Sequence, residues 1–98
     1  MTISKSKAAE LLRRNNQVIW DCVEGTTLLC NTGTVEFFKL NDTGAMIWEL
    51  CERRTVEEVI ETVHAQCPIA DRTLIAALVR DYIHVLQKEG LLETPQMI

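Results

Sequence analysis

The stretch "KLNDTGAMIWELCERRT", residues 39–55, contains the point at which the chain changes from strand-like to helical sequence. Before Asn41, short runs of β-branched and aromatic residues are typical of strands. From Asp42 onward, apolar residues recur with a period of about 3.6, as they do on one face of a helix. Asn41 is suited to cap that helix, which is expected to run to about Glu52. The stretch therefore predicts a domain with a sheet in its first half and helices in its second half.

A second helix is expected to follow after a very short link. Thr55-Val56-Glu57-Glu58 matches the capping box, in which the threonine hydroxyl and the second glutamate's carboxylate each accept a hydrogen bond from the other residue's backbone amide. This helix is expected to end at about Gln66, because Pro68 disfavours helical geometry just before it. The first two helices are thus predicted to be joined without a glycine.

Upstream of residue 39, three short segments are predicted to be strands: Gln17–Cys22, Thr26–Asn31 and Thr34–Leu40. They are rich in Val, Ile, Thr, Trp and Phe. Two dipeptides that end in glycine, Glu24-Gly25 and Thr32-Gly33, separate them, which predicts two tight hairpins. The first half is therefore expected to be a three-stranded antiparallel meander.

Both faces of the predicted sheet are largely apolar. With two-residue turns, one face carries Ile19, Leu28, Cys30, Val35 and Phe37, and the other carries Val18, Trp20, Leu29, Phe38 and Leu40. An antiparallel sheet in water normally keeps one polar face. Helices are expected to cover one face. The amino-terminal arm, a second copy of the chain and a ligand remain as alternatives for shielding part of the other face.

The third predicted helix is the longest, from a cap at Asp71 to about Glu89, before Gly90, which readily adopts the left-handed conformation of a helix end. On a helical projection, apolar residues cover about half of its circumference. The centre of this arc is formed by Ile75, Val79, Tyr82, Ile83 and Leu86, and one side is extended by Leu74, Leu78 and Val85. The extended flank is either additional core or one wall of a groove that accepts a strand beside the sheet edge.

The length of 98 residues corresponds to one domain with one modest core. We expect residues 1–16 to form a flexible or short helical amino-terminal arm, residues 17–93 the folded domain, and residues 94–98 a tail. The predicted fold class is α+β and winged-helix-like, with a three-stranded antiparallel amino-terminal sheet followed by three helices.

The composition argues against two classes of partner. The net charge is −4 and the ten Lys and Arg residues are scattered, which argues against nucleic-acid binding. No apolar run approaches the roughly 18 residues of a membrane span, and the amino terminus lacks the apolar segment of a signal peptide. We therefore expect a cytoplasmic protein with neither nucleic acid nor membrane as a partner.

The sequence contains no motif for catalysis or for cofactor binding. Cys22, Cys30, Cys51 and Cys67 have a spacing that is poor for zinc, so we expect buried free thiols. Surface charge and helix capping account for His64, His84, Glu57, Glu58 and Glu61. The sequence therefore predicts a protein that is not an enzyme, with no catalytic residue, no metal site and no cofactor.

Two segments, "LNDTGAMIWELCERRTVEEV" (residues 40–59) and "LQKEGLLE" (residues 86–93), resemble the PqqD-like family of peptide chaperones, also called RiPP recognition elements. The shared features are a Leu-Asn entry into the first helix, a Thr-Val-x-Glu start of the second and a Gly-Leu-Leu after the last. The resemblance covers roughly residues 17–93. The chain departs from the family pattern at Glu52-Arg53-Arg54, where the family usually has an acidic-glycine turn, and at Leu78, where a polar residue is expected.

The resemblance implies a non-catalytic adaptor. Proteins of this family bind the leader segment of a ribosomally synthesised precursor peptide as a strand added to the third strand and packed against the third helix. They present the precursor to a modifying enzyme such as a radical S-adenosylmethionine enzyme, a cyclase or a leader peptidase. The expected peptide-binding residues are Val35, Phe37, Lys39, Arg72, Leu74, Leu78 and Tyr82. Lys39 and Arg72 are expected to attract an acidic leader. The alternatives are a structural or dimerising winged-helix-like module, with a homodimer formed through the sheet, and a nucleic-acid binder.

Overall fold

The structure is a computed structural model that describes residues 11–93. In this range the elements are β1 (Val18–Val23), β2 (Thr26–Asn31), β3 (Glu36–Leu40), α2 (Asp42–Leu50), α3 (Val56–Gln66) and α4 (Arg72–Lys88). The strands form one antiparallel sheet in the order β1-β2-β3. The predicted α+β class, with three antiparallel strands followed by three helices, is confirmed.

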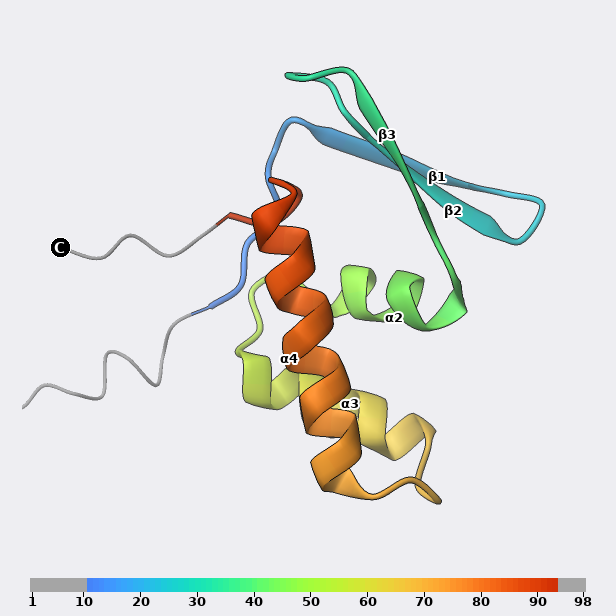
Figure 1. The fold of residues 1–98 in the computed structure, drawn as a ribbon, viewed down its shortest axis with the longest axis vertical. Helices are drawn as coiled ribbons and strands as arrows, with labels where there is room; N and C mark the ends of the chain where they lie inside the picture. The colour runs from blue at the N-terminus through green and yellow to red at the C-terminus, as the bar shows by residue number, and fades with distance from the viewer. Residues whose placement is uncertain (1–10, 94–98) are drawn as a thin grey trace, which may run out of the picture.

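The sheet forms one end of the molecule, and the helices lie on one side of it (Figure 1). α2 lies beneath the sheet and contacts β2 and β3, whereas α4 begins at the far end, where α3 packs against it, and ends below the sheet. The core between these layers includes Leu29 and Leu40 from the sheet, Ile47 and Trp48 from α2, Val59 and Ile60 from α3, and Val79 and Ile83 from α4. One face of the sheet is therefore covered by helices and the other is not.

The β2–β3 hairpin differs from the prediction in the length of its loop. Asn31 pairs with Glu36, so the loop has four residues, Thr32 to Val35, instead of two. The Asn31 side chain accepts hydrogen bonds from two backbone amides of this loop, a local interaction that favours the longer turn. Val35, with φ 58°, therefore lies in the loop and not in the strand. Because the pairing shifts by two residues, the other side chains stay on their predicted faces.

The helices begin and end at local capping signals. The side chain of Asn41 accepts a hydrogen bond from a first-turn amide of α2. Thr55 and Glu58 form both hydrogen bonds of the predicted capping box. Asp71 caps α4, and Gly90, with φ 80°, follows its last turn. These interactions involve residues two or three positions apart, which is why the sequence predicts the helix boundaries to within about two residues.

Residues 11–16 are extended and packed onto the domain, whereas the sequence predicted an arm that continues through residue 16. Arg14 forms an antiparallel bridge with Leu92. Leu12 is buried, and its backbone pairs with the link between α2 and α3. These partners are distant in sequence, so no local pattern indicates them. The rest of the predicted arm, residues 1–10, and the predicted tail, residues 94–98, lie outside the described residues.

The four cysteines are free thiols in different environments. Cys51 is buried as predicted, and burial raises the pKa of its thiol to about 12. Cys22 and Cys67 are exposed, and Cys30 is half-buried. The prediction of buried thiols is therefore wrong for Cys22 and Cys67, because the outer part of β1 and the link after α3 are exposed to solvent.

Candidate functional site

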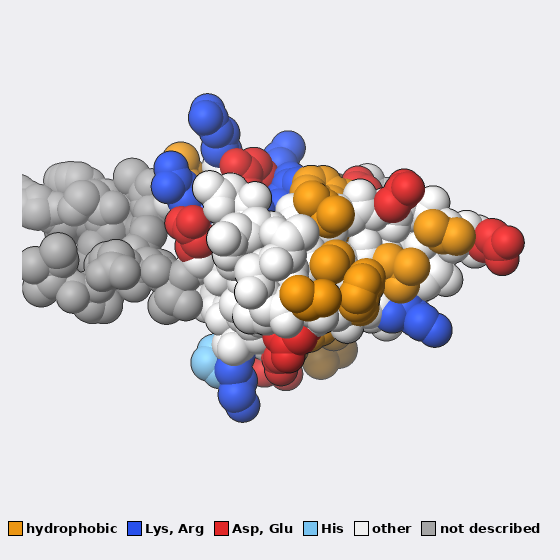
Figure 2. Space-filling view, turned by 90° about the horizontal axis from the view of Figure 1, so that it is seen from above, with side chains coloured by type: hydrophobic (Ala, Val, Ile, Leu, Met, Phe, Trp, Pro, Cys, Tyr) orange, Lys and Arg blue, Asp and Glu red, His pale blue; other side chains and the backbone are white. Residues whose placement is uncertain are grey.

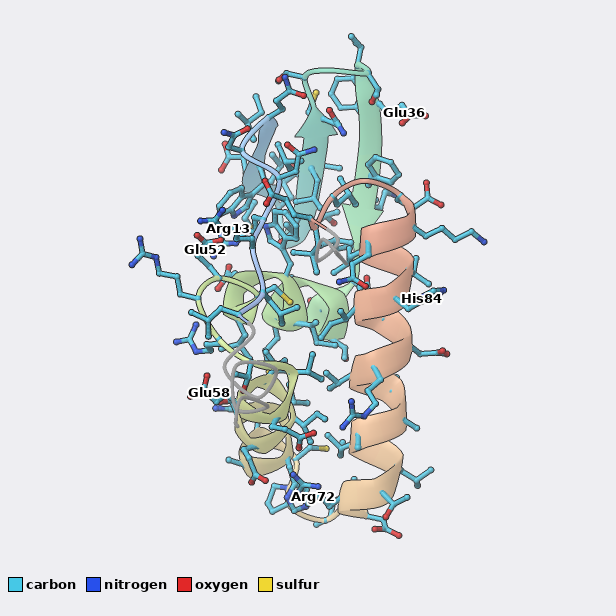
Figure 3. All side chains as sticks on the ribbon, turned by 90° about the vertical axis from the view of Figure 1, so that its left-hand side faces the viewer. Arg13, Glu36, Glu52, Glu58, Arg72 and His84 are labelled. Carbon is cyan, nitrogen blue, oxygen red and sulfur yellow. The ribbon has the colours of Figure 1, made fainter. Side chains whose placement is uncertain are left out.

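The edge of β3 that faces away from β2 is unpaired within residues 11–93, because the strand order is β1-β2-β3. Backbone N–H and C=O groups on such an edge are available to pair with an added strand. Figure 3 shows β3 on the same side of the molecule as α4, with β1 on the opposite side. The two unpaired edges of the sheet therefore differ, since only the β3 edge has a long helix on its side.

Four side chains on one face of α4 form a stripe, which we call the α4 stripe: Leu74, Leu78, Tyr82 and Val85. Their spacing of four, four and three residues places them one above another on the helix. Leu74, Leu78 and Val85 are 67%, 45% and 51% exposed, and Tyr82 is half-buried. The core face of the same helix is formed by Ile75, Val79, Ile83 and Leu86. The flank that extends the predicted apolar arc is thus exposed surface and not additional core.

Tyr82 connects the α4 stripe to the first turn of α2. Its hydroxyl lies so close to Gly44 that a Cβ atom on residue 44 would overlap it. Gly44 comes four residues after Leu40, the last residue of β3. The tyrosine ring therefore packs against the first turn of α2, which directly follows β3 in the chain. Partial burial raises the pKa of Tyr82 above its ordinary value, so the phenol stays protonated and can donate a hydrogen bond.

The two predicted site residues on β3 lie on the sheet face opposite the helices. Phe37 is 71% exposed, and Lys39 is exposed on the same face, whereas Leu40 faces the core. A strand added beside β3 would direct alternate side chains towards the α4 stripe on one side and towards Phe37 and Lys39 on the other. The structure therefore does not bring Phe37 and Leu78 into one pocket. They lie on two sides of the same edge, and Val35 lies in the loop before it.

Arg72 faces α3 instead of the α4 stripe. Its Nε donates to Oε2 of Glu61 over 3.1 Å, and its Nη2 lies 3.5 Å from Oε1 of Glu57. The hydrogen bond and charge of Glu61, followed by those of Glu57, raise the pKa of Arg72. Two carboxylates therefore already balance its charge, and its side chain points towards α3.

Val85 extends the α4 stripe beyond the residues that were predicted for the site. The helical periodicity of the sequence places Val85 on the apolar flank, although it is not among the predicted peptide-binding residues. Its separation of seven positions from Leu78, two helical turns, is the signal that includes it. Whether a residue on such a flank is exposed depends on the packing of α4 against α2 and α3, which the periodicity does not contain.

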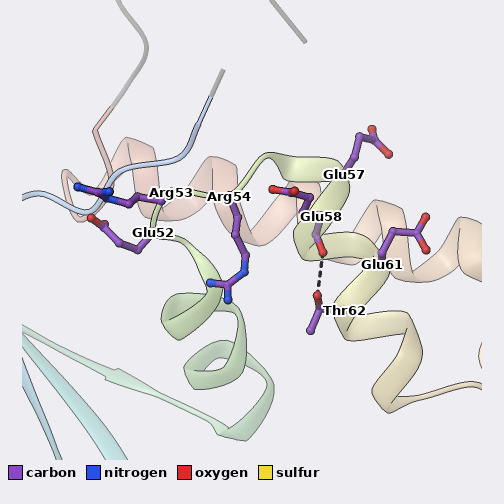
Figure 4. A pocket seen from close by; sticks show the side chains of 7 residues that line it. All are labelled: Glu52, Arg53, Arg54, Glu57, Glu58, Glu61 and Thr62. Carbon is purple, nitrogen blue, oxygen red and sulfur yellow. Dashed lines mark hydrogen bonds between the residues drawn. The ribbon is translucent and has the colours of Figure 1, made fainter. Parts of the chain in front are cut away.

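A hollow of about 580 Å³ beside the link between α2 and α3 is lined by Glu52, Arg53, Arg54, Glu57, Glu58, Glu61 and Thr62 (Figure 4). Its carboxylates already have intramolecular partners. The Glu58 carboxylate accepts the capping-box hydrogen bond, its carbonyl accepts from the Thr62 hydroxyl, and Glu57 and Glu61 pair with arginines of α4. The interpretation of these glutamates as caps and surface charge is confirmed.

His64 has a structural position in the described part of the chain. His64 Nε2 lies 3.2 Å from the carbonyl oxygen of Ala70 and so joins α3 to the link before α4. Within residues 11–93, no group of three or more His, Cys, Asp or Glu side chains is placed to hold a metal ion. No helix in this range has both the length and the apolar character to cross a membrane. The β3 edge and the α4 stripe are therefore the arrangement that we develop as the candidate site.

The sequence of the folded part matches a known family. A family model described as "Coenzyme PQQ synthesis protein D (PqqD)" matches residues 26–92, which is more than half of the chain. The chain belongs to the PqqD family. The predicted resemblance is thereby confirmed, and the match to the PqqD family includes β2, β3 and all three described helices. A search of curated proteins found no match.

Two solved structures share the fold of this PqqD-family chain. One is TbiB1 in complex with the TbiA(beta) leader peptide, with a TM-score of 0.77, 24% sequence identity, and coverage of 87% of this chain and 99% of that one. The other is lasso peptide synthetase B1 complexed with the leader peptide, with a TM-score of 0.76, 16% identity, and coverage of 87% and 100%. At these identities the similarity establishes the fold.

Proposed function

We propose that this PqqD-family protein binds the leader segment of a ribosomally synthesised precursor peptide as an additional strand on β3 and presents the precursor to a modifying enzyme. The unpaired β3 edge, with the exposed α4 stripe on its side of the molecule, is the observation that carries the proposal. Two proteins with a similar fold were solved with a leader peptide bound, which supports it. The protein acts as a binding adaptor, and its partner performs the chemistry on the precursor.

Strand addition divides affinity and specificity between two kinds of contact. Backbone hydrogen bonds to β3 contribute affinity that depends only weakly on the leader sequence. Every second side chain of the added strand points towards the α4 stripe, where Leu74, Leu78 and Val85 offer apolar surface. Complete burial of one apolar anchor contributes about 1.5–3 kcal/mol. We therefore expect the leader to carry apolar residues at alternate positions.

Attraction of an acidic leader is expected to depend on Lys39 and not on Arg72. Within residues 11–93, Lys39 forms no salt bridge, and its side chain lies on the outer side of the strand that accepts the peptide. Arg72 is already paired with Glu61 and Glu57. Lys39→Glu is therefore expected to lower the affinity for the leader more than Arg72→Gln does. It should also reduce the dependence of that affinity on salt concentration more strongly.

The partner enzyme is expected to belong to one of the classes that the family resemblance implies: a radical S-adenosylmethionine enzyme, a cyclase or a leader peptidase. With the leader on the β3 edge, the segment to be modified extends away from the domain and remains accessible. The adaptor function thus needs no reactive group in this chain.

The decisive experiment is a calorimetric titration of the purified protein with the leader peptide encoded beside its gene. Leu78→Asp should weaken binding at least about tenfold, because the carboxylate loses hydration against the apolar leader. Ile69→Asp is the matched control, since Ile69 is 97% exposed in the link between α3 and α4 and lies off the stripe. Circular dichroism establishes that both variants are folded. A wild-type chain that fails to bind the leader, or equal losses in the two variants, would contradict the proposal.

A further inference from the structure

The sheet face opposite the helices carries an exposed apolar area. The proposed function involves only the part of this area that lies on β3. It is formed by Ile19, Leu28, Cys30 and Phe37, of which Ile19 is 62% and Phe37 71% exposed. These side chains line a shallow hollow across all three strands. Figure 2, which looks down on this end of the molecule, shows apolar side chains gathered over the sheet. We call this area the outer sheet face.

The outer sheet face has an ordered arrangement of charge and apolar groups. Across the strands, Asp21 pairs with Leu28, and Leu28 pairs with Lys39. An acidic side chain on β1 and a basic side chain on β3 thus lie on either side of an apolar one on β2. The neighbouring row on the same face is entirely apolar: Ile19, Cys30 and Phe37. Within residues 11–93, neither Asp21 nor Lys39 forms a salt bridge.

We propose that the outer sheet face binds a second copy of this chain, sheet against sheet, about a two-fold axis parallel to β2. This axis places β1 of each subunit over β3 of the other and β2 over β2. Asp21 of each subunit then faces Lys39 of the partner subunit, so the dimer contains two complementary charge pairs. Leu28 packs near the axis against its symmetry mate, and Ile19 packs against Phe37 of the partner subunit. A two-fold interface requires this kind of self-complementary surface.

The charge pattern favours a second copy of this chain as the binding partner, and it favours a two-fold axis parallel to β2. A two-fold axis across the strands would place β1 over β1, so Asp21 would never face Lys39, and an axis through their row would bring like charges together, which is unfavourable. The face spans three strands at about 4.8 Å spacing and so offers at most a few hundred Å² per subunit, less than the roughly 800 Å² of a standard interface. We therefore expect a weak dimer. The β3 edge stays open in this arrangement, but Phe37 and Lys39 lie beside both the added strand and the dimer interface.

The first test is sedimentation equilibrium of the full chain from micromolar to millimolar concentration. The average mass is expected to rise from the 11.1 kDa of one chain towards twice that value. Leu28→Asp should weaken dimerisation at least about tenfold, because it places two carboxylates in the apolar centre. Ile69→Asp should have no effect on it. A mass of one chain at every concentration, as expected if a different protein occupies this face, would overturn the proposal.

Charge reversal tests the axis. Asp21→Lys and Lys39→Asp should each weaken homodimerisation by about tenfold, because each variant brings like charges together. A mixture of the two variants should form heterodimers, since both facing pairs are then opposite in sign. Lys88→Asp, on α4, is the control for a change in net charge. If the wild-type chain dimerises and the mixture does not, the proposed axis is wrong.

Cys30 provides a site-specific readout of the same axis. It is half-buried on the outer sheet face of β2, so the two Cys30 thiols face each other across sheets about 10 Å apart. In a chain with Cys22 and Cys67 replaced by serine, a short bis-maleimide should link two subunits, and the Leu28→Asp change should abolish the product. A dimer without this product would overturn the face-to-face arrangement. Ile19→Ser, on β1, removes apolar surface from the dimer interface without adding a charge beside Lys39, so it should weaken dimerisation and leave leader affinity unchanged. Leu78→Asp should leave dimerisation unchanged, so the two proposals can fail separately.

Discussion

The hydroxyl of Tyr82 overlaps the position that a Cβ atom would take on residue 44, so α4 approaches α2 closely at a glycine. Gly44 is buried in the first turn of α2, where glycine costs roughly 1 kcal/mol relative to alanine in helix propensity. The contact explains why a small residue occupies this position. Since Tyr82 also belongs to the α4 stripe, the packing of the two helices and the shape of the proposed groove depend on the same pair of residues.

Gly44→Ala is expected to lower the free energy of unfolding by about 1–3 kcal/mol, because the overlap with Tyr82 outweighs the gain in helix propensity. Urea unfolding of the variant measures this loss. The double variant Gly44→Ala/Tyr82→Leu removes the phenol that overlaps the new Cβ atom. Its loss of unfolding free energy should therefore be smaller than the sum of the losses in the two single variants. If Gly44→Ala instead raises the free energy of unfolding, as helix propensity alone predicts, the contact with Tyr82 does not constrain the helices.

Arg14 is expected to stabilise the fold much more than its neighbour Arg13. The guanidinium of Arg14 lies 4.6 Å from the ring centre of Trp20 and 5.4 Å from that of Trp48, and its side chain is 19% exposed. Arg14→Ala should therefore lower the free energy of unfolding by about 1–3 kcal/mol. Arg13, with a side chain 70% exposed, is the matched control, and Arg13→Ala should change stability by less than about 0.5 kcal/mol. Similar losses for the two variants would contradict a special role of the Trp20–Arg14–Trp48 cluster.

Cys51 is expected to make stability depend on pH in the alkaline range. Burial raises the pKa of its thiol from 9.0 to about 12 in the folded chain. As the pH rises through 9, the unfolded chain loses this proton first, so the contribution of Cys51 is complete below pH 9 and declines towards pH 12. The total decline is up to about 4 kcal/mol. Urea unfolding of wild-type and Cys51→Ala chains at several pH values measures this decline. If the free energy of unfolding depends on pH in the same way in both chains, Cys51 is not its cause.

Amide hydrogen exchange distinguishes the two edges of the sheet. On saturation with leader peptide, amides on the free side of residues 36–40 should exchange more slowly, because they donate to the added strand. Amides of residues 18–23 should keep their rates, since β1 has no exposed helix stripe beside it. The Leu78→Asp chain under the same conditions provides the control. Protection of β1 alone would place the leader on the other edge.

The amino-acid sequence by itself determined the order of the elements and the ends of the helices. The caps at Asn41, Thr55 and Asp71, the stop at Gly90 and the change of period after Leu40 involve residues a few positions apart. Such interactions form within one turn and need no other part of the chain. The same holds for the face assignment of the strands, which survived the longer β2–β3 loop because a shift of two residues preserves the side-chain alternation.

Tertiary structure alone decided which apolar and charged residues are available to a ligand. The leucines of the α4 stripe and the buried residues of α4 have the same periodicity, and only packing against α2 and α3 separates them. Arg72 pairs with Glu57 and Glu61 of α3, and residues 12–15 pair with residues 91–93 and the α2–α3 link. Each of these outcomes depends on contacts between segments distant in sequence, whose geometry no local pattern specifies.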